Sequence, residues 1–488
     1  MKEKSIKLNM LMSVVNTSAN FIFPLITYSY VARILHSSGT GKVAFVQSVI
    51  TYFSYIAALG ISGYGMRECA KVRKDKDKLS KLTQELISIN LVSTLISYLL
   101  LLLVVVFVPR FSSYKTLFLV MSSSIFLQTL GMEWLYNALE QYTYITVRSL
   151  IFKTTSVFLT FILIKDVDDY VIYGGLTIFT TAASNVLNFI NARKYIYRKR
   201  YTHYCYKKHL KPIMMFFMSA IIITVYSQFD TVMIGFIKGD SAVGIYNAAL
   251  KIRTIVISIS TGITSVLVPR MSVYYSENQE KFKQLLIKSF KISIVVLMPL
   301  AVFIFLNAED VLLFLCGAEY LSANTTLRIL MICVCALMLT NLFGNQILVP
   351  KGEEKRYTKS VFVGMWINLI LNSILIPKFG SAGAAFATLI TEISNTIWMG
   401  IGCKEEIRYI KKNINSALYI LPLIVASIFE VICYSWVNSL GVFWRLTLKT
   451  IVLFGMYYIL LAIKKEEIIG IGIQSIKKIV ARNKYHKE

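Results

Sequence analysis

Residues 66–108 read MRECAKVRKDKDKLSKLTQELISINLVSTLISYLLLLLVVVFV, a basic stretch followed directly by a long apolar one. A helix needs roughly 20 apolar residues to cross about 30 Å of hydrocarbon, and residues 84–108 exceed that length. The run is continuously apolar, whereas the strands of a membrane barrel alternate between apolar and polar residues. The stretch therefore predicts a transmembrane helix with a charged loop at one end.

The same pattern recurs along the whole chain of 488 residues, in which 56% are hydrophobic, 16% are charged and the mean hydropathy is +0.61. These values are far above those of a soluble domain. We expect an all-α polytopic membrane protein with about 14 spans. The expected spans are 10–34, 40–62, 84–108, 114–139, 145–165, 168–191, 213–237, 243–269, 289–315, 322–349, 358–377, 381–402, 415–437 and 443–463.

The basic residues predict the orientation of these spans. If the N-terminus is cytoplasmic, the cytoplasmic segments hold 37 Lys and Arg residues and the external loops hold 7. Lys and Arg accumulate in short cytoplasmic loops. We therefore expect both termini in the cytoplasm of a multi-pass protein of the inner membrane.

The formal net charge of +26 raises the alternative of nucleic-acid binding. Residues 192–212 hold eight basic residues interleaved with tyrosines, a pattern that binds single strands in some proteins. This segment lies between two spans, where Tyr and Lys/Arg clusters contact anionic lipids. Membrane lipids are the expected partner and nucleic acid is not. Residues 467–480 similarly predict an interfacial amphipathic helix.

Catalytic and metal motifs are missing from the sequence. It holds no P-loop, its seven cysteines are scattered, and its four histidines fall in expected loops or the tail. We expect no enzyme activity, no metal site and no cofactor.

Internal similarity at an offset of about 200 residues divides the chain. Residues 31–49 can be laid over residues 232–252, which aligns Gly41 with Gly244. Parallel repeats of this kind are typical of transporters that bind substrate near the midplane. The expected parts are an N-lobe (1–191), a basic cytoplasmic linker (192–212), a C-lobe (213–402), two further spans (403–463) and a cytoplasmic amphipathic tail (464–488).

Ionisable residues inside spans are costly and usually face a cavity. Asp230 near the outer end of span 7 and Lys251 and Arg253 near the outer start of span 8 lie at similar depth. They form a candidate charged cluster, and the alternative is an ion pair that locks two helices. Arg33, near the outer end of span 1, either faces the same space or extends outward to the interface.

A second charged group lies near the cytoplasmic side. Glu133 and Glu140 end span 4, and Arg148 and Lys153 open span 5. The group is a candidate gate, with Arg148 as a docking point for a charged head group, or else ion pairing that defines the turn between the spans. Lys449, near a bundle end, is expected to extend to the interface.

A third group is rich in oxygen ligands. Asn368 and Asn372 share one face of span 11, and Thr388 and Glu392 share one face of span 12. With Asp230 they form a candidate coupling-ion site, because carboxylate, amide and hydroxyl oxygens suit Na⁺ and a carboxylate can carry H⁺ instead. The alternative is hydrogen bonding between helices.

Several runs resemble one family along essentially the whole chain. The runs are Pro24…Tyr30-Val-Ala-Arg33-Ile-Leu…Gly39-Thr-Gly41, Gly63-Tyr-Gly-Met-Arg-Glu68, Glu133-Trp-Leu-Tyr136, Gln228-Phe-Asp230-Thr-Val-Met-Ile-Gly235 and Gly244-Ile-Tyr246-Asn-Ala-Ala-Leu-Lys251-Ile. They are similar to Wzx-type flippases of O-antigen and capsular polysaccharide repeat units. These belong to the multidrug/oligosaccharidyl-lipid/polysaccharide exporter superfamily, whose two six-helix lobes form a V.

The resemblance implies a function and assigns residues. It implies translocation of undecaprenyl-diphosphate-linked oligosaccharide across the bacterial cytoplasmic membrane by alternating access, with a polysaccharide polymerase as a candidate partner. By motif position, related lipid II flippases point to Arg33, Lys251 and Arg253 as cavity cations and support a cation site at Asp230, Asn368, Asn372 and Thr388. In the lipid II flippases two additional helices bind the lipid tail. Spans 13 and 14 of this chain depart from that pattern, because Glu430 is their one unusual residue.

Two rival functions remain. A multidrug/cation antiporter of the same fold would favour acidic cavities, whereas the spans here hold more Arg and Lys than carboxylates. An integral-membrane glycan polymerase would need a large external loop, and every expected external loop has about 15 residues or fewer.

Overall fold

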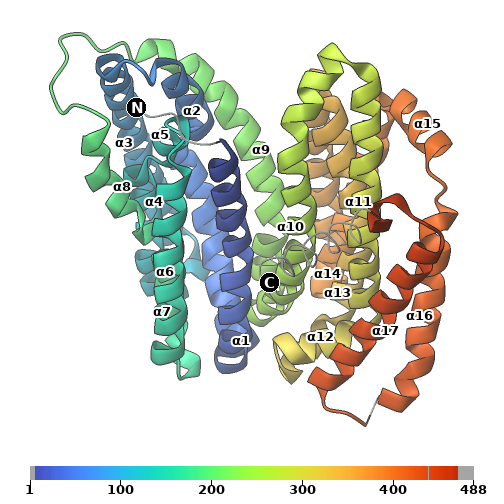
Figure 1. Cartoon of the computed structure of the whole chain (residues 1–488). Coiled ribbons are helices and arrows are strands. Elements are labelled where there is room, and N and C mark those ends of the chain that lie inside the picture. The colour runs from blue at the N-terminus through green and yellow to red at the C-terminus, as the bar shows by residue number, and fades with distance from the viewer. Residues whose placement is uncertain (1–5, 438, 471–488) are drawn as a thin grey trace, which may run out of the picture. The chain divides into compact units, whose positions relative to one another are not determined.

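The computed structural model describes residues 6–437 and 439–470, and every regular element in these ranges is a helix (Figure 1). The expected all-α class is confirmed. The helices of the first half are α1 (Ile6–Ala58), α2 (Ile61–Val72), α3 (Lys76–Phe107), η1 (Pro109–Tyr114), α4 (Lys115–Gly131), α5 (Glu133–Ala138), α6 (Tyr142–Leu163), η2 (Val167–Asp169), α7 (Tyr170–Ile178), η3 (Phe179–Ala183), α8 (Asn185–Asn191) and η4 (Ala192–Lys194). Those of the second half are α9 (Lys207–Lys238), α10 (Asp240–Glu277), α11 (Gln279–Leu306), α12 (Ala308–Leu315), η5 (Ala318–Ala323), α13 (Asn324–Asn341), η6 (Leu342–Leu348), α14 (Glu354–Gly402), α15 (Lys404–Asn413), α16 (Ala417–Val437) and α17 (Val442–Ile463).

Within the described residues, 11 helices are long and apolar enough to cross a membrane, or 12 if the bent pair of α15 and α16 is one span. The chain is therefore a multi-pass membrane protein. Two of the longest helices contain a non-helical residue, His36 (φ 56°) in α1 and Gly380 (φ 56°) in α14. Both breaks fall between spans that the hydropathy pattern separates. The count of fourteen stays a prediction, since it requires each of these helices to be two spans.

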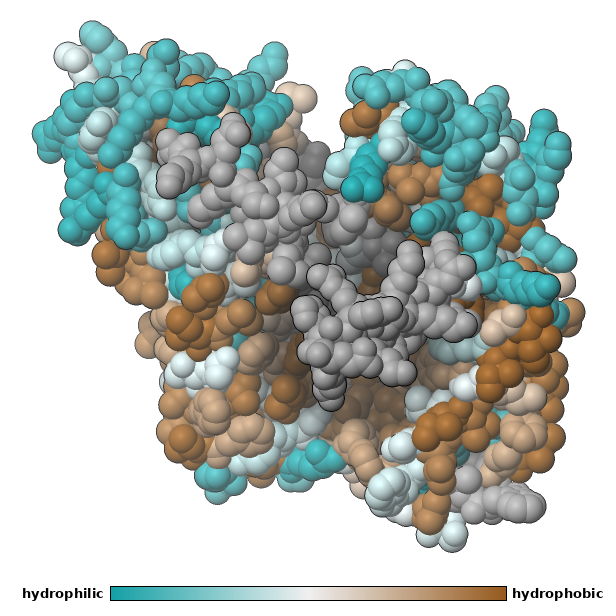
Figure 2. All heavy atoms as spheres, viewed as in Figure 1, coloured by the Kyte–Doolittle hydropathy of each residue, from teal (hydrophilic) through white to brown (hydrophobic). Residues whose placement is uncertain are grey.

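The outward surface of α3 is apolar. Leu95, Leu99, Leu102 and Val106 follow helical spacing and are 54–65% exposed. Figure 2 shows the same contrast in each part of the molecule, with hydrophobic side chains along the helices and hydrophilic ones at the end that carries the basic loops. Such exposed apolar stripes are what lipid-facing helices require.

The described chain forms two compact units, which we treat separately. Unit 1 is the chain up to Ala248 together with Val361–Ala387, and unit 2 comprises Ala249–Ser360 and the chain from Thr388 onward. The lobe boundaries expected from the repeats stay a prediction, because contacts within one structure do not test a sequence repeat.

In unit 1, α1 crosses the start of α10 at very short range. A Cβ on Gly41 would lie 1.8 Å from the Asp240 carbonyl oxygen, and one on Gly244 would lie 2.0 Å from the Ser37 carbonyl oxygen. The hydroxyls of Ser37 and Ser241 lie 2.6 Å apart at this crossing. The two glycines that the repeats align therefore allow two backbones to touch.

Residues 63–83 lie between two expected spans and were expected to form a loop, but residues 61–72 form the helix α2. Its apolar face enters a buried cluster made by α2, α3 and α5, with Ile61, Tyr64, Leu79, Leu86, Trp134, Leu135, Ala138, Leu139, Ala192 and Ile213 among its members. His209, expected in a loop, lies in the first turn of α9. It is buried with Nε2 2.9 Å from Glu85 Oε2 and Nδ1 2.8 Å from the Tyr64 hydroxyl.

In unit 2, buried charges fix α17 and α16 to the rest of the unit. Lys449 Nζ donates to Asp310 Oδ2 at 2.8 Å, and Arg445 donates to the other carboxylate oxygen. Asn307 Nδ2 donates to Glu430 Oε1 at 2.8 Å. The expectation that Lys449 extends to the interface was wrong, since it is 4% exposed and held by a carboxylate. The expected amphipathic helix at 467–480 lies outside the described residues from 471 onward.

Candidate functional site

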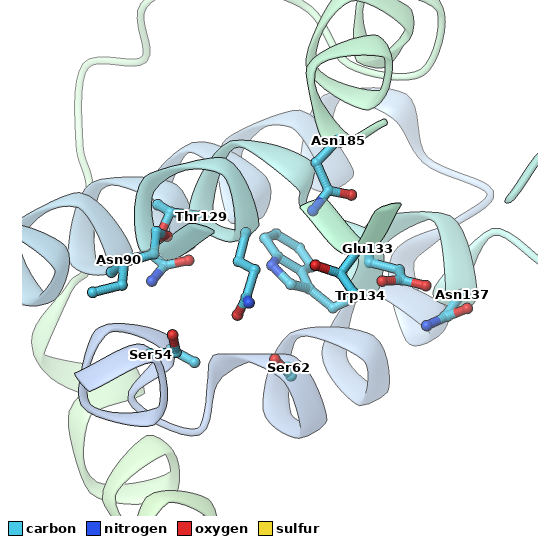
Figure 3. A pocket seen from close by; sticks show the side chains of 12 residues that line it. Ser54, Ser62, Asn90, Thr129, Glu133, Trp134, Asn137 and Asn185 are labelled. Carbon is cyan, nitrogen blue, oxygen red and sulfur yellow. The ribbon is translucent and has the colours of Figure 1, made fainter. Parts of the chain in front are cut away.

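Helices of unit 1 line a partly open polar pocket of about 340 Å³. Figure 3 shows Ser54 and Ser62 on one side, Asn90, Thr129 and Asn185 on the other, and the Trp134 indole between them. The lining residues come from α1 (Ser54, Ala58), α2 (Ser62), α3 (Asn90), α4 (Ile125, Gln128, Thr129), α5 (Glu133, Trp134, Asn137), η3 (Thr181) and α8 (Asn185).

A break between α4 and α5 forms one wall of this pocket. Met132 adopts a left-handed conformation (φ 40°, ψ 41°), so α4 stops at Gly131 and α5 starts at Glu133 in a new direction. A Cβ on Gly131 would lie 2.4 Å from Asn185 Cγ, so only glycine lets α4 approach α8 this closely. The interruption places both Glu133 and Trp134 at the pocket.

Hydrogen bonds fix further polar residues of the lining. Asn90 Nδ2 donates to the Ala57 carbonyl at 2.6 Å, and the Thr129 and Thr94 hydroxyls lie 2.7 Å apart. Asn185 Oδ1 accepts from Arg148 Nη1 at 3.3 Å. These contacts fix polar groups in a membrane-embedded bundle, where helix–helix hydrogen bonds replace water.

Arg148 and Lys153 lie behind the pocket wall. Arg148 is 6% exposed and donates to the Ser184 carbonyl at 3.0 Å. Lys153 is 5% exposed and donates to Asn20 Oδ1 at 2.5 Å. Glu140 forms its ion pair with Arg73, and not with Arg148 or Lys153 of the following span.

The remaining predicted cations lie on two helices. Arg33 is exposed on α1 and its Nη1 donates to the Ser29 carbonyl at 2.9 Å. Lys251 and Arg253 are half-buried on the part of α10 that belongs to unit 2. The structure therefore places Arg33 in one unit and the other two in the second unit.

Three of the five residues expected at a coupling-ion site meet in unit 1. Asn372 Nδ2 donates to Asp230 Oδ1 at 2.6 Å and lies 2.9 Å from Asn368 Oδ1. The Tyr246 hydroxyl donates to Asp230 Oδ2 at 2.6 Å. All four side chains are buried. Tyr246 was missed, although it stands in a run that resembles the family and follows Asp230 by 16 residues.

Thr388 and Glu392 belong to unit 2 instead. Glu392 is buried and accepts from the Thr340 hydroxyl at 3.3 Å, and that hydroxyl lies 2.8 Å from the Thr396 hydroxyl. Within the described residues no group of three or more His, Cys, Asp or Glu side chains could hold a metal ion.

Most of the pocket was missed by the sequence reasoning. Glu133 alone was singled out, because only ionisable residues within spans were considered. Asn90, Gln128 and Asn185 are uncharged, yet each interrupts an otherwise apolar span. Such polar interruptions are the signal that identifies them.

Comparison with known proteins supports the resemblance. Residues 6–275, more than half of the chain, match the family described as polysaccharide biosynthesis protein, and residues 216–374 match the family MatE. A putative O-antigen transporter of Shigella dysenteriae is 26% identical over 404 residues, which cover 80% of this chain and 98% of the relative. A putative O-antigen transporter of Escherichia coli K12 is 23% identical over 390 residues, which cover 80% and 94%.

Solved structures show the same fold. The lipid II flippase MurJ in an inward closed conformation aligns over 94% of this chain and 99% of its own, with a TM-score of 0.73 and 17% identity. An inward-facing multidrug resistance MATE family transporter aligns over 82% and 99%, with a TM-score of 0.62 and 14% identity. The fold is that of the multidrug/oligosaccharidyl-lipid/polysaccharide exporter superfamily, and the chain belongs to the polysaccharide biosynthesis protein family.

Proposed function

We propose that this protein is a flippase that moves lipid-linked oligosaccharides across the cytoplasmic membrane for surface polysaccharide biosynthesis. One observation carries the proposal: a polar pocket of about 340 Å³ lies within helices whose outer surface is apolar. Polar groups inside a membrane bundle are costly and mark a pathway for a polar substrate. The family and the two O-antigen transporter relatives support this substrate class.

Arg33 in unit 1, and Lys251 and Arg253 in unit 2, are the candidate donors to the phosphate oxygens of the carrier lipid. Arg and Lys donors suit phosphate oxygens, and charge-assisted hydrogen bonds are about twice as strong as neutral ones. Arg33 is exposed and the other two are half-buried, so their side chains reach the surface of their units. Arg148 contributes indirectly, because its guanidinium holds Asn185 in place. Undecaprenyl diphosphate is the carrier that the resemblance to Wzx-type flippases implies.

Ion coupling is a second element of the proposal. Asp230, Asn368 and Asn372 supply oxygen ligands of the kind that Na⁺ needs, and the buried Asn372 Oδ1 accepts no hydrogen bond from the described residues. Asp230 would supply charge balance for Na⁺, or it would carry H⁺. Thr388 and Glu392, which belong to unit 2, are further candidate ligands for a coupling ion. An ion shifts the transporter between states only if it binds one of them more tightly.

Glu133 and Glu140 are the proposed gate residues. Glu133 is exposed at the pocket, and Glu140 pairs with Arg73 in the loop between α2 and α3. Breaking the Glu140–Arg73 pair would release the α2–α3 corner from the end of α5. The charge distribution of the loops supports cytoplasmic termini in a bacterial inner membrane. A polysaccharide polymerase is the proposed partner that consumes the product.

Surface polysaccharide in a strain that lacks the chromosomal gene tests this function. The wild-type gene should restore polysaccharide, and Lys251→Ala with Arg253→Ala should abolish it at equal protein abundance in the membrane. Lys412→Ala is the matched control, since this exposed lysine of α15 has no proposed role. Normal export by the double variant would disprove the head-group role.

A multidrug/cation antiporter is the second candidate, favoured by the match of residues 216–374 to MatE. It predicts that the strain expressing the gene resists cationic drugs and that surface polysaccharide does not depend on the gene. The same strain pair decides between the two functions. A glycan polymerase is disfavoured, because the connections expected outside the membrane are short.

A further inference from the structure

We infer that the unit 1 pocket is a sugar-binding subsite that holds one or two neutral rings of the oligosaccharide, apart from the cations that bind the diphosphate. The inference rests on the proposed function and extends it, because it separates recognition of the glycan from recognition of the carrier. The pocket residues are those given above for α1–α5, η3 and α8.

The hydrogen-bonding groups of the pocket suit a polyol. Besides two aliphatic residues, an indole and one carboxylate, the lining consists of four hydroxyls and four side-chain amides. Amides and hydroxyls both donate and accept, as the hydroxyl and acetamido groups of a sugar do. Gln128 and Asn137 form no side-chain hydrogen bond with the described residues, so their donors and acceptors are available to a ligand.

Trp134 adds an apolar surface at a fixed position. A Cβ on Gly65 would lie 2.9 Å from Trp134 Cε3, so the ring packs directly on the α2 backbone. The residue is 6% exposed and is one of the lining residues of the pocket. Its indole N–H has no hydrogen-bond acceptor among the described residues. An aromatic ring with a polar edge can bind the apolar C–H surface of a sugar and donate to a hydroxyl.

The charges of the pocket exclude the diphosphate as its ligand. Among the described residues that line it, Glu133 is the only charged one, and its carboxylate repels phosphate. Arg148 and Lys153 do not line the pocket, and their end groups are already held by Ser184, Asn185 and Asn20. A Glu carboxylate that accepts from two sugar hydroxyls fits the same position.

The size of the pocket limits what it holds. At about 340 Å³ it lies at the lower end of the roughly 300–1,000 Å³ typical of ligand sites. That volume accommodates one or two rings and excludes a full oligosaccharide, so the rest of the glycan must remain outside. The subsite would therefore read only part of the repeat unit.

Binding measurements on the full chain in lipid nanodiscs test the inference. The three probes are the host's undecaprenyl-diphosphate-linked oligosaccharide, the free oligosaccharide released from it by mild acid, and undecaprenyl diphosphate without sugar. The pocket variants are Gln128→Ala and Asn137→Ala. Gln284→Ala is the matched control, because this amide is exposed in unit 2 and bonds only Glu280. Thermal unfolding establishes that each variant is folded.

Each pocket variant should weaken binding of both sugar-containing probes about tenfold, since one lost hydrogen bond to a ligand corresponds to roughly that factor. Binding of undecaprenyl diphosphate should change less than twofold, and the control should match the wild type on all probes. Unchanged sugar binding in both variants, or an equal loss for undecaprenyl diphosphate, would overturn the subsite. A wild-type protein that binds no lipid-linked oligosaccharide would instead refute the proposed function.

Discussion

Replacing Asp230 by Ala should lower the free energy of unfolding by about 3 kcal/mol. The substitution removes two hydrogen bonds of 2.6 Å, one from the Tyr246 hydroxyl and one from Asn372 Nδ2. Both donors are buried, at 1% and 0% exposure, so water does not replace the lost acceptor. Each unsatisfied buried donor costs about 1–3 kcal/mol, which sets the expected total. Asp230→Asn keeps the shape and one acceptor, so it should cost roughly half as much.

Unfolding of the purified protein in mixed micelles of increasing dodecyl sulfate content measures these free energies. Asn372→Ala alone and together with Asp230→Ala completes a double-mutant cycle, with an expected coupling of about 1–2 kcal/mol for residues in one hydrogen-bond network. Ser373→Ala is the control on the same helix, since its exposed hydroxyl bonds only the Leu369 carbonyl. An Asp230→Ala variant as stable as the wild type, or a coupling near zero, would refute the buried network.

Three further outcomes follow from other contacts. Asp310→Ala should lower the free energy of unfolding by about 3 kcal/mol in the same assay, because the buried Lys449 loses a carboxylate 2.8 Å away. A loss under 1 kcal/mol would contradict that contact. Gly41→Val should prevent folding or export, because even the Cβ of the introduced valine would overlap the backbone of α10. A variant that folds and exports normally would contradict the close crossing of α1 and α10. Burial by itself lowers the pKa of Lys351, but Glu406 at 2.7 Å raises it above the ordinary value. The stabilisation from this pair is therefore present below the pKa of an unfolded lysine and is lost as the pH rises through the raised pKa. The difference in the free energy of unfolding between the wild type and Lys351→Met should shrink in alkaline buffer. A pH-independent difference would contradict the pairing.

Hydropathy predicted the course of the helices well, because each span must satisfy its own backbone in lipid. The loops expected between spans 1 and 2 and between spans 11 and 12 coincide with the non-helical residues His36 and Gly380. The same method misjudged residues 63–83, where polarity suggested a loop. There α2 is amphipathic and buries Tyr64 against neighbouring helices, a contact that average hydropathy does not register.

Partners of buried charges could not be predicted from one sequence. Lys449 meets Asp310 across 139 residues, and Glu140 meets Arg73 across 67 residues, so neither pair has a local signature. Asp230 and Asn372 were expected at one candidate site and lie in contact, because counting residues from span ends gives depth in the membrane. Depth gives no rotation about the helix axis, and Tyr246 was therefore missed.

Transport of lipid-linked oligosaccharide by the purified protein in sealed vesicles tests the central claim most directly. The substrate is labelled on its glycan and its leaflet is followed by the access of an external glycosidase to that glycan. The account predicts rapid exchange between leaflets in vesicles that contain the wild-type protein, and slow exchange in empty vesicles and with the Lys251→Ala, Arg253→Ala double variant. Equal rates in wild-type and empty vesicles would contradict it.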